Sequence, residues 1–173
     1  MAFKDLIPWY QNHSRVLSFR QTSDPYKIFV SEIMLQQTQV KTMLPYYDAF
    51  MKTYPTVSHL ASASLEEVLK HVQGMGYYRR FKFMHQAAKV IHTQYQGKFP
   101  NSYEEVRALP GVGMYTAGAI MSIAFKKPYS ALDGNVMRVL SRLYEIGDDV
   151  RLNQTQKTMN QLNQSIVEKH TPD

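Results

Sequence analysis

Apolar side chains recur at helical spacing along most of the chain, and strict apolar–polar alternation is nowhere long enough to indicate a strand. The clearest helical pattern follows Asp24 and Pro25, which are typical of an N-cap and a first helical position. The apolar residues that share one face of this predicted helix are Tyr26, Phe29, Val30, Ile33 and Met34. The pattern predicts an all-α fold.

Capping residues, glycines and prolines mark the ends of further predicted helices. The segments Ser64–Glu67 and Ser102–Glu105 both have the Ser-x-x-Glu form of a capping box. Turns rich in Gly and Pro are predicted at 54–56, 73–76, 97–100 and 109–113. One more apolar stripe predicts a helix late in the chain, on Val136, Val139, Leu140 and Leu143.

The composition, 44% hydrophobic and 20% charged over 173 residues, is typical of one globular domain or of two small lobes sharing a core. No apolar run reaches the length of a membrane span, and the first residues lack the features of a secretory signal. The absence of cysteine excludes disulfides and thiolate-bound metal, and the six histidines show no metal-ligand spacing. We expect a cytoplasmic protein with no metal and no membrane partner, nucleoid-associated if bacterial.

The net charge of +6 suggests a polyanionic partner, and its distribution sharpens that suggestion. In QGMGYYRRFK (73–82), a glycine turn presents Tyr77 beside Arg79, Arg80 and Lys82. Aromatic side chains flanked by basic ones can open a stack of bases. The alternative is that Tyr77 lies in the core while the basic side chains are solvated.

The segment LPGVGMYTAGAI (109–120) predicts a tight hairpin followed at once by a helix. Gly111 and Gly113 allow the turn, and the small residues from Thr116 onward allow close packing against the preceding helix. The free amides at the helix start, together with the helix dipole, suit a phosphate oxygen. A helix-hairpin-helix that holds the DNA backbone without reading sequence is favoured over an ordinary corner between helices.

Two carboxyl groups occupy contrasting environments. Glu32, in SEIMLQQTQV (31–40), has apolar neighbours and no lysine or arginine placed to neutralise it, so burial is expected to raise its pKa. Asp133, in ALDGNVMRVLSR (131–142), is placed as the N-cap of a helix beginning near Asn135, which is expected to lower its pKa. Such a pair suits acid catalysis through an oxocarbenium-like ion. Alternatively, the two carboxyls are a solvated acid and a plain cap.

Five segments, in this order and spacing, resemble the A/G-specific adenine DNA glycosylases (MutY family) of the helix-hairpin-helix-GPD superfamily: DPYKIFVSEIMLQQTQV, GMGYYRR, GKFP, LPGVGMYTAGAI and LDGNVMRVLSR. The resemblance runs from about Trp9 to Leu143. It implies two α-helical lobes with kinked DNA between them. A six-helix lobe would span about 24–135 and include the hairpin, and 1–23 plus 136–173 would form part of the second lobe.

The resemblance also implies a reaction and its residues. A monomer would hydrolyse the N-glycosidic bond of adenine mispaired with 8-oxoguanine or guanine in double-stranded DNA. Glu32 matches the acid that protonates adenine at N7 and later helps activate water, and Asp133 matches the group that stabilises the charged sugar. The other matched residues are Tyr115 and Asn135, which position these groups, and Gln37 and Tyr77, which insert at the lesion. The hairpin residues Gly111, Gly113 and Thr116 would contact DNA.

One position distinguishes this chain from the endonuclease III branch, and one segment departs from the pattern of the family it resembles. In the endonuclease III branch a lysine forms a Schiff base where this chain has Tyr115, so the resemblance implies a monofunctional glycosylase. The adenine pocket of the family is lined by Arg-x-Leu-Pro-Trp-Arg, whereas this chain has Arg15-Val-Leu17-Ser-Phe19-Arg20. Phe19 offers a base less stacking area than Trp would.

Most family members carry four cysteines that bind a 4Fe-4S cluster and then a C-terminal domain that recognises 8-oxoguanine. This chain has neither, so we expect a C-terminally incomplete catalytic domain. Two alternatives stay open: a fragment that binds DNA but is inactive, and a thymine or oxidised-pyrimidine glycosylase of the same superfamily.

Overall fold

The computed structural model describes residues 5–169, which form ten α-helices, one 3-10 turn and no strands. The predicted all-α fold is confirmed. Residues 1–4 and 170–173, which belong to the expected second lobe and include His170, lie outside the described residues. The elements are α1 (Leu6–His13), η2 (Ser18–Arg20), α2 (Pro25–Leu35), α3 (Val40–Thr53), α4 (Val57–Ser62), α5 (Leu65–His71), α6 (Arg79–Gln94), α7 (Tyr103–Ala108), α8 (Met114–Ile123), α9 (Gly134–Leu143) and α10 (Asn153–Lys169).

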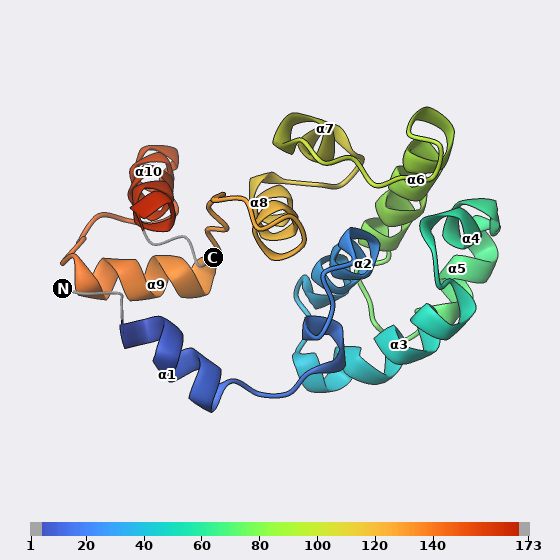
Figure 1. Ribbon diagram of the computed structural model, residues 1–173, viewed down its shortest axis with the longest axis horizontal. Coiled ribbons are helices and arrows are strands. Elements are labelled where there is room, and N and C mark those ends of the chain that lie inside the picture. Colours follow the sequence, from blue (N-terminus) through green and yellow to red (C-terminus); the bar gives the residue numbers. More distant parts are fainter. Residues whose placement is uncertain (1–4, 170–173) are drawn as a thin grey trace.

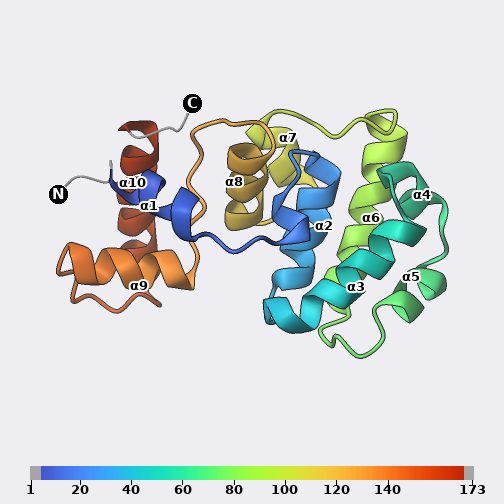
Figure 2. The same cartoon turned by 60° about the horizontal axis from the view of Figure 1, so that its bottom comes forward.

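The helices form a larger and a smaller group (Figure 1). The larger group holds α2 to α8, which are seven helices where a six-helix lobe was expected. The smaller group holds α1, α9 and α10. Figure 2 shows α8 on the side of the larger group that faces the smaller one.

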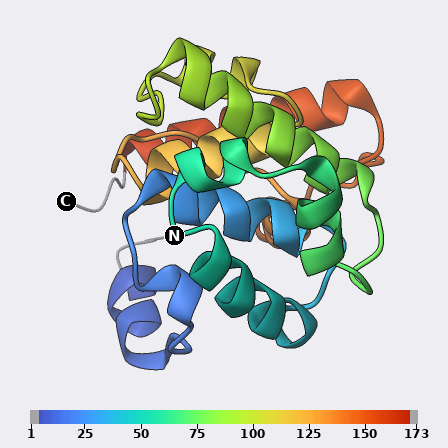
Figure 3. The ribbon, with the colours of Figure 1, turned by 90° about the vertical axis from the view of Figure 1, so that its right-hand side faces the viewer.

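Helix α2 runs through the middle of the larger group (Figure 3). Asp24 caps it as predicted, because its carboxylate accepts hydrogen bonds from the Tyr26 and Lys27 amides. Helix α2 packs on α3, α6 and α8, and eight of its eleven residues are buried, Glu32 included. Phe19 of η2 joins the same core, where its ring meets that of Tyr47 edge-on.

The two predicted capping boxes differ in detail. At α5 both reciprocal bonds between Ser64 and Glu67 are present, which confirms that box. At α7 the Ser102 hydroxyl accepts from the Glu105 amide, but the Glu105 carboxylate accepts from that hydroxyl at 2.7 Å. The α7 cap is therefore one-sided, although the helix begins where the pattern predicted it.

The smaller group is thinly packed. Helix α1 has no buried residue, and α9 buries only Leu140, which together with Met159 of α10 lies outside the main core. Val139 is 59% exposed, so the apolar stripe predicted for 136–143 is only partly turned inward. None of the helices within residues 5–169 is long and apolar enough to cross a bilayer.

A close backbone crossing joins the two groups. An added Cβ at Gly118 of α8 would lie 1.9 Å from the Ser130 carbonyl oxygen, so only glycine fits there. The sequence suggested that the small residues of α8 face the preceding helix, but Gly118 faces the segment that leads to α9. Polar side chains of α10 hold that segment from its other side: Ser130 bonds to Asn160, Asn163 and Gln164, and Gln164 also donates to the Pro128 carbonyl.

Replacing Gly118 by Ala is expected to lower the free energy of unfolding by about 2–3 kcal/mol, because the new methyl group would force the backbone of the α8–α9 segment away. Chemical denaturation of both proteins measures the difference. Gly147→Ala is the matched control, since an added Cβ there meets nothing within 4 Å. Equal stability of the two variants would contradict the predicted clash.

Candidate active site

Glu32 is buried in α2, with 2% of its surface exposed, and it has two partners. The Tyr115 hydroxyl donates to Glu32 Oε2 at 3.0 Å, and Arg20 Nη1 lies 3.0 Å from Glu32 Oε1. The expectation that no arginine neutralises Glu32 was wrong. Arg20 is twelve positions earlier and reaches Glu32 only because η2 folds back against α2, which no local pattern indicates.

The contact between Arg20 and Glu32 is an ion pair without the geometry of a hydrogen bond. Glu32 Oε1 is a buried oxygen to which no group within residues 5–169 donates a well-aligned hydrogen bond. The Arg20 side chain is one-third exposed, whereas that of Glu32 is 1% exposed. Oε1 therefore has one partner, and that partner borders solvent.

Asp133 caps α9, as the sequence predicted. Its Oδ1 accepts from the Val136 amide at 2.8 Å, and its Oδ2 accepts from Asn135 Nδ2 at 2.9 Å. The helix begins at Gly134, one residue before the predicted start. Because both oxygens are engaged, the carboxylate is fixed in orientation beside the helix N-terminus.

The Tyr115 phenol is affected by both carboxylates. Burial raises the pKa of its phenol, and the negative charge of Glu32, its hydrogen bond to Glu32 and the charge of Asp133 raise it further, while Arg20 lowers it. Tyr115 also borders a cavity together with Leu132, the residue before Asp133, so the start of α9 lies near the phenol that is bonded to Glu32. Tyr115 is a neutral donor in this arrangement.

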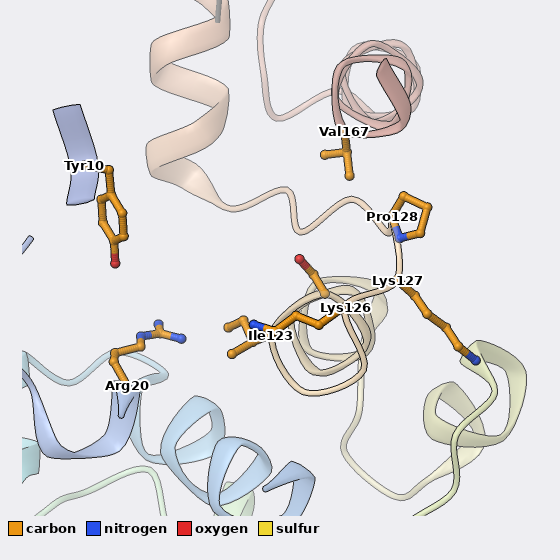
Figure 4. A pocket seen from close by; sticks show the side chains of 8 residues that line it. Tyr10, Arg20, Ile123, Lys126, Lys127, Pro128 and Val167 are labelled. Atoms are coloured by element: carbon orange, nitrogen blue, oxygen red, sulfur yellow. The ribbon is translucent and has the colours of Figure 1, made fainter. Parts of the chain in front are cut away.

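A cavity of about 500 Å³ opens beside Arg20, between the two helix groups. Figure 4 shows Tyr10 and Arg20 on one side, Ile123 and Lys126 on another, and Val167 of α10 above them. The neighbouring Lys127 points away, and its ammonium donates to the Asn101 carbonyl at 2.6 Å. Arg20 thus separates the buried Glu32 from an open space that carries a second positive charge.

The hairpin residues adopt the conformation that the sequence predicted. Gly111 has φ +76°, and an added Cβ there would lie 2.6 Å from Phe83 Cβ. The amides in the first turn of a helix have no intrahelical acceptor. Gly113, the N-cap of α8, has no side chain that could accept from them. Thr116 has only 3% of its surface exposed, so its side chain does not face solvent as a DNA contact would require.

Gln37 and Tyr77 occupy the tips of two turns. Both have the left-handed backbone that is uncommon for residues other than glycine, with φ +54° and +48°. Tyr77 is 66% exposed, which excludes the alternative that it lies in the core. The neighbouring Arg80 is 7% exposed, so the interpretation of 79–82 as one solvated basic cluster was wrong for Arg80.

The three residues expected to line an adenine pocket differ in burial. Arg15 is exposed, and Leu17 is partly buried against the core. Phe19 has 1% of its surface exposed, and its ring packs against Tyr47. In this structure the Phe19 ring offers no face to a base, because η2 turns it into the core.

Sequence reasoning missed Arg20, Arg80 and the partner of Gly118. Each of them involves a contact with a residue at least twelve positions away in the sequence. Arg20 was noted only as the end of the segment 15–20. A weak signal for its role existed, because a buried carboxylate requires a partner from elsewhere in the chain.

Residues 30–168 match the family described as "HhH-GPD superfamily base excision DNA repair protein", and the chain belongs to this family. It is 43% identical to the adenine DNA glycosylase of Buchnera aphidicola subsp. Baizongia pistaciae over 145 residues, which are 83% of this chain and 41% of that protein. It is 44% identical to the adenine DNA glycosylase of Homo sapiens over 158 residues, which are 86% of this chain and 29% of that protein. The chain thus spans less than half of either relative, and the resemblance in the sequence is confirmed.

Solved structures agree with the expected fold. A thermostable thymine-DNA glycosylase superposes with a TM-score of 0.83 at 28% identity, covering 94% of this chain and 75% of that one. An endonuclease III trapped as a covalent intermediate with DNA superposes with a TM-score of 0.75, covering 99% and 75%, and at 20% identity it supports the fold alone. The helix-hairpin-helix glycosylase fold is confirmed.

The residues present do not fit a 4Fe-4S cluster. Such a cluster needs thiolate ligands, and this sequence contains no cysteine. Within residues 5–169 no three His, Asp or Glu side chains gather as metal ligands would.

The raised pKa of Tyr115 predicts a loss of stability at high pH. Because the folded state favours the neutral phenol, its contribution is fully present below the unfolded value near 10 and is lost as pH rises above it. Tyr47, whose pKa burial raises to about 12, contributes in the same direction. In denaturation experiments between pH 8 and 11, Tyr115→Phe is expected to lose less stability than wild type.

The control is Tyr144→Phe, which removes a half-exposed phenol whose hydroxyl makes no hydrogen bond within residues 5–169. Its stability is expected to fall with pH as the wild type does. A wild-type slope in Tyr115→Phe would contradict the assigned environment of this phenol.

Proposed function

We propose that this chain is the catalytic region of an adenine DNA glycosylase that hydrolyses the N-glycosidic bond of adenine mispaired with 8-oxoguanine or guanine. The observation that carries the proposal is the hydrogen bond from Tyr115 to Glu32, together with the cavity that Tyr115 shares with Leu132, the residue before Asp133. One acid is buried and the other is fixed at a helix N-terminus. This division suits a reaction that needs a proton donor and a lasting negative charge.

Glu32 is the general acid. It gives its proton to N7 of the extruded adenine, the C1′–N9 bond breaks, and the bonding electron pair leaves with the base. A positive charge develops on the sugar, and the Asp133 carboxylate stabilises it. Water then attacks C1′ and its proton returns to Glu32.

Arg20 controls access to this acid. Glu32 is buried behind Arg20 and Tyr115, so a base can reach its carboxyl only when one of them moves. Arg20 is the more exposed of the two contacts on the carboxyl. A base that displaces Arg20 would lie beside Oε1, the oxygen to which no group within residues 5–169 donates a hydrogen bond.

DNA is held by the hairpin. The uncapped N-terminus of α8 presents its amides to a phosphate, and the left-handed Gly111 lets the hairpin lie close against α6. Gln37 and Tyr77, at exposed turn tips, are placed to enter the base stack. Tyr115 occupies the position at which the endonuclease III branch has its Schiff-base lysine. Base release without strand cleavage is therefore proposed.

A thymine glycosylase is the second candidate, because a thymine-DNA glycosylase superposes closely on this chain. Its identity of 28% is lower than the 43% and 44% of the adenine glycosylases. We therefore favour adenine.

Glu32→Gln is expected to lower the single-turnover rate of adenine release from an A:8-oxoguanine duplex by at least about 10²-fold, since the amide cannot donate the required proton. Quench-flow or gel assays after alkali treatment measure the rate. Glu66→Gln, at an exposed position on α5, is the charge-matched control and should keep the wild-type rate. Wild-type activity in Glu32→Gln would remove Glu32 from the proposed role.

A panel of mispairs separates the candidate functions. Adenine release from A:8-oxoguanine and A:G, with the strand intact until alkali is added, is the expected result. Thymine release from T:G would instead identify the second candidate. Salt-dependent binding without release of any base would identify a DNA-binding fragment.

A further inference from the structure

Three turns that lie far apart in the sequence meet at the first turn of α6. They are the α2–α3 turn with Gln37, the turn before α6 with Tyr77, and the hairpin with Gly111. Together they border a cavity of about 290 Å³. The hairpin lies so close to α6 that a side chain at Gly111 would collide with Phe83.

Arg80 fixes the other two turns. Its Nη1 donates to the carbonyls of Met34, at 3.1 Å, and of Gln36. Its Nη2 donates to Thr38 Oγ1 at 2.8 Å and to the Met75 carbonyl at 3.4 Å. One planar guanidinium therefore spans from the α2–α3 turn to the turn that carries Tyr77.

The charge of Arg80 has no carboxylate partner within residues 5–169. It is 7% exposed and is satisfied by carbonyl and hydroxyl oxygens, while its Nε has no acceptor. Burying a guanidinium in this way is unfavourable unless these bonds form together. Arg79 next to it is exposed, so the two neighbouring arginines occupy different environments.

Both turns need such support. Gln37 and Tyr77 have left-handed backbones, which residues other than glycine keep only where their surroundings hold them. The Gln36 carbonyl that precedes Gln37 and the Met75 carbonyl two residues before Tyr77 both accept from Arg80. Arg80 thus donates hydrogen bonds to both turns, close to the left-handed residues Gln37 and Tyr77.

We propose that Arg80 is a positioning residue for mispair recognition, whose guanidinium holds the Gln37 and Tyr77 turns at a fixed separation so that both side chains enter the DNA together. The inference rests on the proposed function. Arg80 itself does not touch DNA. Arg79 is exposed and therefore available to a phosphate, whereas Arg80 is buried.

The test compares Arg80→Met and Arg80→Lys with Arg79→Met, each in the Glu32→Gln background so that substrate is not consumed. Hydrogen exchange of the amides in 36–39 and 75–78 reports on the turns. The ratio of Kd for a matched duplex to Kd for an A:8-oxoguanine duplex reports on recognition. Arg80→Met is expected to speed exchange in both turns and to lower the ratio, each by about tenfold or more.

Arg80→Lys keeps the charge, but one ammonium cannot reach both turns, so it is expected to restore at most one of them. Arg79→Met is expected to leave exchange unchanged and to weaken binding to both duplexes alike. Exchange in α2 and the body of α6 stays at the wild-type rate in all three variants. This last measurement separates loosened turns from a loosened fold.

Wild-type exchange in the turns of Arg80→Met would overturn the proposal, and so would full restoration by Arg80→Lys, because charge alone would then suffice. A wild-type Kd ratio in Arg80→Met would overturn the role in recognition alone. A parent protein that does not distinguish the two duplexes and releases no adenine would overturn the proposed function itself.

Discussion

The contact between Gly118 and the Ser130 carbonyl determines where the site can form. Helix α8 carries Tyr115 at its N-terminal end, and the segment that crosses α8 at Gly118 leads directly to Asp133. Any side chain at 118 would push this segment outward and take Asp133 away from Tyr115. The two acids come from helices a hundred residues apart, and this crossing is what allows them to meet.

Around that crossing, each polar group of the site is held by another. Tyr115 donates to Glu32, Arg20 faces the other oxygen of Glu32, and Asn135 and the Val136 amide fix Asp133. The arrangement is asymmetric. Asp133 has well-formed bonds to both oxygens, whereas Glu32 has one good bond and one contact that borders solvent. Glu32, the proposed general acid, is thus the carboxylate with the looser partner.

Local chemistry made much of the fold predictable. Asp24 and Asp133 cap helices because capping depends on residues within one turn, and the glycine hairpin at 111–113 depends on its own backbone. Contacts through space were not predictable. The partners of Glu32 and Arg80 follow from how helices stack, and the inward turn of Phe19 follows from the path of η2. Spacing along the chain carries no information on these.

The hydrogen bonds between α10 and the segment 128–130 involve no charged group. Each of them links a neutral amide, a hydroxyl or a backbone group: Ser130 with Asn160, Asn163 and Gln164, and Gln164 with Pro128. Neutral bonds respond little to ionic strength, while attraction to a polyanion weakens steeply as salt is added. For the proposed DNA-binding function, changes in ionic strength are therefore expected to alter the affinity for a duplex while leaving the spacing of the two acids unchanged.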